Sequence, residues 1–199
     1  MLCLPNAFDG LAKACKFFDK MVLKFSFFLF FFLAIAGFAQ GEEIIPWSAD
    51  RKLQWSDFKG KYLKTEWAAA TTASSISYKF STYEKDGQVY VDFVVGCEFY
   101  PKKSWYRPDM VDDLILSHEQ LHFDIAELHA RKFRKRLAET RFTANIKEEV
   151  REIYKEVLKE LYIFQNRYDH ETNFSRDTQK QMEWNKMIAE ALEQEAKLP

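Results

Sequence analysis

The fold is decided by residues 114–128, which read LILSHEQLHFDIAEL. Leu114, Leu121, Ile125 and Leu128 recur every three, four or seven residues, so they share one face of a helix with about 3.6 residues per turn. The surrounding sequence predicts a helix over about residues 109–137 that packs this face against a core.

The sequence that follows predicts two more helices, over about residues 144–166 and 175–196. In the first of these, apolar side chains recur every three or four residues, the period of one buried helix face. Its predicted inward-facing residues are Ile146, Val150, Ile153, Val157, Leu161 and Phe164, and those of the last helix are Met182, Ile188 and Leu192.

Two segments before the helices have the pattern of β-strands. Residues 70–83 alternate between apolar and polar side chains, and residues 88–99 are rich in valine and aromatic residues. Between them, Asp86 and Gly87 suit the tight turn of a hairpin. The sequence therefore predicts an α+β protein in which a small antiparallel sheet, a hairpin that a third strand could extend, is followed by three helices.

The first predicted helix carries an H-E-x-x-H motif at residues 118–122. His118 and His122 lie one turn apart on one face, so both imidazoles can bind the same metal ion. Glu119 leans beside that ion, where it can act as a general base towards water. The motif predicts a catalytic site with Zn²⁺ as the cofactor. The alternative is a trio of side chains that holds no metal.

A catalytic zinc ion needs a third protein ligand, which the first helix does not offer. His129 shares the azimuth of His118 but lies roughly 16 Å further along the axis. The polar cluster of residues 168–171, just after the second predicted helix, is the nearest candidate, because an antiparallel return brings it to the start of the first helix. The residues of this cluster that remain open as the third ligand are Asp169, His170 and Glu171.

Tyr168 belongs to the same cluster. Its hydroxyl could serve catalysis by donating a hydrogen bond to the oxyanion that forms when water attacks a carbonyl group. The alternative is a packing role at the end of the second helix, which is common for buried tyrosines.

The N-terminal residues have the composition of a secretory signal peptide. Two lysines precede an apolar run over residues 25–39, which ends in small residues. The run is shorter than the about 20 residues that span a bilayer. We expect residues 1–39 to form the signal region, with Met21 as an alternative start, and residues 40–199 to form one domain. An uncleaved anchor is the alternative.

Four parts of the chain resemble DUF922, a family of exported bacterial proteins of unknown function described as predicted zinc-dependent proteases. These parts are residues 116–137, the WSDFKG segment at residues 55–60, the AATT segment at residues 69–72, and the Y-D-x-x-T motif at residues 168–172. The resemblance covers nearly the whole chain after the signal region. It implies a zincin-like fold and zinc-dependent peptidase activity.

Many members of that family carry Y-D-x-x-T-x-H-G near the last helix, whereas this chain has Phe174 and Ser175 in place of the H-G pair. If that histidine is the family's third ligand, this chain uses another residue or has lost activity. The retained part of the motif favours Asp169 as the third metal ligand, with His170 second.

Composition limits the classes of partner. The chain of 199 residues has a formal net charge of −1, with basic and acidic side chains interleaved. This balance gives no general attraction to nucleic acid or to anionic membranes. After signal cleavage only Cys97 remains, so the mature chain cannot form an internal disulfide, and we expect this thiol to be buried.

We therefore expect a secreted or periplasmic zinc-dependent metallohydrolase of the H-E-x-x-H type, a peptidase that acts on protein or peptide substrates. We expect no nucleic-acid partner and no stable membrane span after signal cleavage. Two alternatives stay open: a catalytically inactive envelope binding protein with a zincin-like fold, and a zinc amidase acting on cell-wall peptides.

Overall fold

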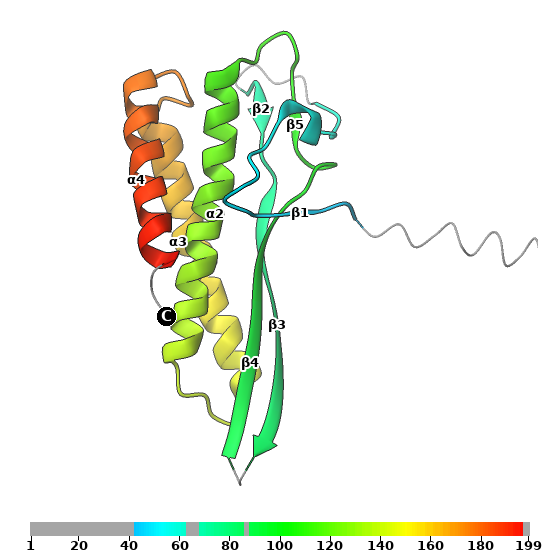
Figure 1. Ribbon diagram of the computed structural model, residues 1–199, viewed down its shortest axis with the longest axis vertical. Coiled ribbons are helices and arrows are strands. Elements are labelled where there is room, and N and C mark those ends of the chain that lie inside the picture. The colour runs from blue at the N-terminus through cyan, green and yellow to red at the C-terminus, as the bar shows by residue number, and fades with distance from the viewer. Residues whose placement is uncertain (1–41, 63–67, 86–87, 197–199) are drawn as a thin grey trace, which may run out of the picture. The chain divides into compact units, whose positions relative to one another are not determined.

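The structure, a computed structural model, describes residues 42–62, 68–85 and 88–196 (Figure 1). The described residues from Glu43 onward form one compact unit. In this unit a small antiparallel sheet is followed by three helices, which confirms the predicted α+β class. The predicted signal region and the predicted turn at Asp86 and Gly87 lie outside the described residues.

The main sheet is a long hairpin with a short third strand. β3 (Ser74–Lys85) pairs antiparallel with β4 (Gln88–Phe99) along its whole length. β1 (Ile45–Pro46) pairs antiparallel with the end of β4, so the strand order is β1-β4-β3. β2 (Ala70–Thr71) and β5 (Trp105–Tyr106) form a separate antiparallel pair, which the sequence pattern did not predict.

Three helices complete the unit: α2 (Asp113–Glu139), α3 (Ile146–Glu171) and α4 (Thr178–Ala196). α2 contacts both strands of the hairpin as well as α3 and α4, and Figure 1 shows it running between the hairpin and the other two helices. None of the described helices is both long and apolar enough to cross a membrane.

The second predicted helix is longer than expected. The sequence pattern ended it near residue 166, whereas α3 continues to Glu171. Leu161 and Tyr168 are buried and Phe164 between them is half-buried, so the apolar face continues at the helical period for another turn. The polar cluster of residues 168–171 therefore lies in the last turn of α3 and not after it.

Most predicted inward-facing residues are buried, the others are half-buried, and Met182 is the one that is exposed. Met182 is 66% exposed, whereas the buried side chains of α4 are those of Gln181, Trp184, Ile188 and Leu192. These four recur at spacings of three and four residues, so they share one face, and Met182 lies about 100° away from Gln181 around the helix. The prediction for Met182 was therefore wrong.

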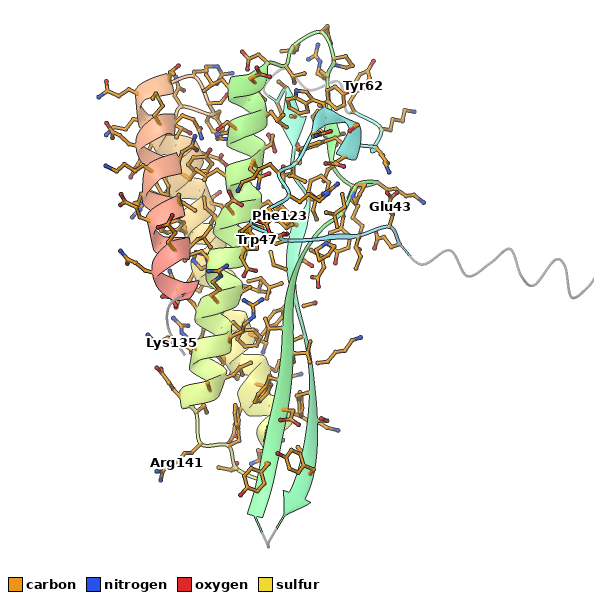
Figure 2. The ribbon with its side chains drawn as sticks, in the orientation of Figure 1. Glu43, Trp47, Tyr62, Phe123, Lys135 and Arg141 are labelled. Carbon is orange, nitrogen blue, oxygen red and sulfur yellow. The ribbon has the colours of Figure 1, made fainter. Side chains whose placement is uncertain are left out.

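The N-terminal arm is fixed to α2. The indole Nε1 of Trp47 donates a hydrogen bond to Oδ1 of Asp124 at 2.7 Å. Figure 2 shows Trp47 and Phe123 at the level where the arm crosses α2. Phe123 and Phe99 are buried, and their rings lie 5.8 Å apart, so the arm, β4 and α2 meet in one core. Cys97 belongs to this core, as predicted, and burial raises the pKa of its thiol well above the ordinary value.

Candidate metal centre

Three side chains converge where the first turns of α2 meet the last turn of α3. Oδ1 of Asp169 lies 3.1 Å from Nε2 of His118 and 2.9 Å from Nε2 of His122. The two Nε2 atoms are themselves 3.3 Å apart. Among the described residues, these three form a group of side chains that could hold a metal ion. The structure therefore contains a candidate metal-binding triad.

The two helices bring the triad together because they run antiparallel. The one-turn spacing of His118 and His122 gives both rings the same side of α2, as expected from the sequence. The amide of Gln165 on α3 donates to the carbonyl oxygen of His122 at 3.1 Å, and the Tyr168 hydroxyl, which donates mainly to Gln181 at 2.8 Å, also lies 3.3 Å from the carbonyl oxygen of His118. These bonds fix the register of α3 against α2, which places Asp169 beside the imidazoles.

The structure separates the three candidates for the third ligand. Asp169 alone among them belongs to the triad. His170 is exposed. Glu171 is also exposed, and its Oε2 accepts a hydrogen bond from the indole of Trp184 at 2.9 Å.

Gln181 fixes the tautomer of His118. Its amide oxygen lies 3.0 Å from Nδ1 of His118 and also accepts the Tyr168 hydroxyl at 2.8 Å. An accepting oxygen requires a proton on Nδ1, so Nε2 is the ring nitrogen that can offer a lone pair to a metal in the centre of the triad. A hydrogen bond at the second ring nitrogen of this kind is the usual support of a histidine that binds a metal.

A chain of hydrogen bonds holds the Gln181 amide in this orientation. Its nitrogen donates to Oδ1 of Asn185 at 2.9 Å, and the Asn185 nitrogen donates to Oγ of Ser117 at 2.9 Å. Gln181 is completely buried. α4 therefore supports the triad, although it contributes no member to it.

Glu119 lines the same cavity as the triad. It follows His118 on α2 and is 6% exposed. Its Oε2 atom is buried without a hydrogen-bond partner among the described residues. A buried carboxylate oxygen of this kind is unfavourable unless a ligand or water completes it. The unpartnered oxygen is therefore an observation in favour of a bound group at this position.

The local charges keep the third member of the triad ionised. Burial disfavours the carboxylate of Asp169, but hydrogen bonds from His118 and His122 outweigh it and hold the pKa of Asp169 well below its usual range. Burial also disfavours protonated His122, whereas the hydrogen bond to Asp169 and the charge of Glu119 raise the pKa of His122 above its ordinary value. The ionised carboxylate is the form in which aspartate binds a metal.

Tyr168 packs against the ring of His118. Its side chain is completely buried, and its ring stacks on that of His118 with centroids 4.6 Å apart. Burial raises the pKa of its hydroxyl well above the ordinary value, although the hydrogen bond to Gln181 acts the other way. These contacts describe a supporting position, and the role in oxyanion stabilisation stays a prediction.

The triad lies in an open cavity of about 420 Å³. One wall is formed by residues 68–72, which include β2, and Oγ1 of Thr72 donates to the carbonyl oxygen of Glu119 at 3.1 Å. The cavity is also lined by Met110, Ile115 and the turn at residues 174–176. The volume of the whole cavity is within the range of about 300–1,000 Å³ that is typical of small-molecule sites.

Of the site residues predicted from the sequence, the structure brings His118, His122 and Asp169 together, with Glu119 lining the same cavity. The sequence prediction missed Gln181. The signal for Gln181 is its position on the apolar face of α4, three residues before Trp184 and seven before Ile188. A polar residue on such a face needs a buried partner.

His129, which was not expected to be a ligand, is buried and its Nδ1 lies 2.9 Å from the carbonyl oxygen of Ile125.

The fold and the site together define an α+β protein with a candidate metal-binding triad between its first two helices. Residues 100–176 match the sequence model of a family described as bacterial protein of unknown function (DUF922). The match confirms the resemblance to this family across the region that holds α2, α3 and all three members of the triad. Comparisons with curated proteins and with solved structures found no match for the chain.

Proposed function

We propose that this protein is an exported zinc-dependent hydrolase of the H-E-x-x-H type that cleaves peptide bonds. The observation that carries the proposal is the convergence of two imidazole nitrogens and one carboxylate oxygen beside the buried carboxylate of Glu119. A catalytic zinc site has the same parts: three protein ligands, one open position and a neighbouring base.

The spacing of the triad atoms supports zinc as the metal. Zinc ligands lie at roughly 2.0–2.1 Å in a tetrahedral arrangement, so two ligand atoms of one ion are about 3.3 Å apart. The two Nε2 atoms are separated by 3.3 Å, and Asp169 Oδ1 lies 3.1 Å and 2.9 Å from them. Two nitrogen donors and one carboxylate also suit zinc in kind.

The chemistry would divide between the metal and Glu119. A zinc ion held by the triad would supply Lewis-acid chemistry, because it lowers the pKa of water and polarises a carbonyl oxygen. Glu119 takes a proton from the attacking water and passes it to the leaving amine nitrogen. The water oxygen bonds to the carbonyl carbon while the carbon–nitrogen bond breaks, so the products are a carboxylic acid and an amine.

The proposed place of action is the periplasm or the outside of the cell. It rests on the signal-peptide pattern of residues 1–39. The proposed substrates are proteins or peptides, because an H-E-x-x-H motif on a helix is typical of metallopeptidases. The balanced net charge of −1 offers no general attraction to nucleic acid.

Replacing Glu119 tests the proposal. Zinc-loaded parent protein is expected to cleave a denatured protein substrate, whereas Glu119→Gln keeps about one zinc per chain and loses at least about 100-fold of the cleavage rate, since a general base contributes about 10²–10⁴-fold. Glu139→Gln, an exposed glutamate at the end of the same helix, is the matched control and keeps full activity. Equal cleavage by the parent and Glu119→Gln would show that Glu119 is not the base.

A second candidate function is a binding protein without catalytic activity. Phe174 favours it, because this exposed side chain lines the cavity where the family resemblance places a histidine. Bound zinc without cleavage of a broad peptide library would favour this candidate. A zinc amidase acting on cell-wall peptides would use the same residues, and cleavage of isolated cell-wall peptides but not of denatured protein would identify it.

A further inference from the structure

We propose that Phe174 determines specificity, by packing against a bulky apolar side chain of the substrate next to the bond that is cleaved. The inference rests on the proposed function, because it assigns a substrate class to the same site. Its support comes from the exposure of Phe174, the backbone that presents it and the small residues that line the same cavity.

Phe174 is an apolar side chain exposed at the candidate site. It is 54% exposed, and Met110, which lines the same cavity, is 44% exposed. The two residues come from different loops, before α2 and after α3. Exposed apolar side chains that gather at a cavity with a few polar groups are typical of ligand-binding sites. An apolar substrate group would cover both.

The backbone of the turn is strained where it presents this ring. The φ angles of Asn173, Phe174 and Ser175 are 48°, 53° and 70°, in the left-handed region that residues other than glycine rarely adopt. Strain of this kind persists only when the surroundings impose it, and it gathers at ligand sites. Phe174 therefore combines two unfavourable features, left-handed backbone and exposed apolar surface, at a residue that lines the cavity.

The turn is tied to the metal-binding triad. The Phe174 N–H donates to the carbonyl oxygen of Asp169 at 2.8 Å. Thr172 is completely buried, its Oγ1 donates to the carbonyl oxygen of Tyr168 at 2.8 Å, and its own carbonyl oxygen accepts the Asp177 N–H at 2.9 Å. These bonds hold the backbone of Phe174 in a fixed position relative to Asp169, so the Phe174 ring is presented at a fixed place beside the triad.

Another wall of the cavity leaves room for a substrate side chain. It includes three consecutive alanines, Ala68, Ala69 and Ala70, whose side chains are small. These small residues, with Phe174 and Met110 elsewhere around the cavity, give the cavity an apolar part that suits leucine, isoleucine, methionine or phenylalanine. The substrate class is therefore a peptide that carries such a residue beside the scissile bond.

The test measures binding separately from cleavage. Isothermal calorimetry on zinc-loaded protein compares an N-acylated leucine hydroxamate with the matching glycine hydroxamate. The parent is expected to bind the leucine compound at least about tenfold more tightly, since one buried aliphatic side chain gives this order of discrimination. Phe174→Ala loses most of that ratio and Phe174→Leu keeps much of it. Tyr162→Ala, which removes a ring that is 68% exposed on α3, keeps it fully.

A ratio near one in the parent, an unchanged ratio in Phe174→Ala, or no binding of either compound would overturn the inference. Cleavage of matched leucine and glycine peptides by the parent and Phe174→Ala is measured in parallel. If the parent cleaves neither peptide but the binding ratio depends on Phe174, the apolar site stands and the proposed hydrolase function fails. If the parent cleaves both equally, the function stands and the inference fails.

Discussion

Asp169 differs from the neighbouring residues of its cluster in what it touches. It contributes the anionic member of the triad, with one oxygen within 3.1 Å of both imidazoles, while the next residue, His170, is exposed. A carboxylate that is held ionised by two histidines adds both charge and a ligand atom to a cation site.

We predict that Asp169→Asn lowers zinc affinity by more than about tenfold, since even residues that only support a ligand contribute about 10–100-fold. His170→Ala leaves the affinity within about twofold. Competition with a chromophoric chelator at neutral pH measures both. A larger loss in His170→Ala than in Asp169→Asn would transfer the ligand role to His170.

The residues of the site differ in how far the sequence can predict them. The spacing of His118, Glu119 and His122 is local, and helix geometry alone puts both rings on one face. Asp169 could be singled out only with the help of a family motif, because the residues next to it in the sequence do not show which side chains of α2 it contacts. Gln181 was missed because its function depends on contacts with residues of two other helices.

At the scale of elements, the site depends on how α2 begins. Asp112 is the N-cap, and its Oδ1 accepts the N–H of Ile115 at 2.9 Å. α2 starts at Asp113, so His118 and Glu119 lie within its first two turns. Fraying of this end would move both side chains away from Asp169.

We predict that Asp112→Ala lowers the free energy of unfolding by about 1 kcal/mol, the usual loss for an N-cap, and weakens zinc binding in parallel. Chemical denaturation with and without zinc measures the two effects. Asp112→Ser is the control and keeps most of both, because its hydroxyl can accept the same hydrogen bond. A cap loss that leaves zinc affinity unchanged would show that the site does not need this turn.

Most of the elements could be predicted from the sequence, and the errors have two causes. Helix faces repeat along the sequence, so three helices and the hairpin could be predicted from periodicity. The end of α3 and the buried face of α4 depend on packing against other elements, which the periodicity does not contain. An extra apolar residue such as Met182 can therefore be assigned to the wrong face. The two-residue pair of β2 and β5 is too short to give a periodic signal.

At the scale of the whole described unit, α2 is the helix that contacts both the hairpin and the other two helices. It packs against the hairpin on one side and against α3 and α4 on the other. The ring of Phe133 on α2 lies 5.5 Å from Tyr78 of β3 and 5.5 Å from Tyr154 of α3, and the Tyr154 hydroxyl donates to the carbonyl oxygen of Ile76. This arrangement joins residues distant in sequence, which no local pattern encodes.

A metal bound by the triad would link α2 to α3 and so stabilise the folded unit. Zinc that binds only the folded state at 100 times its Kd adds about 2.7 kcal/mol to the free energy of unfolding. For a domain of this size that corresponds to a rise in Tm of about 5–10 °C. Differential scanning calorimetry of the mature protein, with zinc and with chelator, measures it. Asp169→Asn is expected to lose most of the shift and His170→Ala to keep it, because Asp169 is the residue of α3 that belongs to the metal-binding triad among the described residues. Equal shifts in both variants would mean that zinc stabilises the protein at another place.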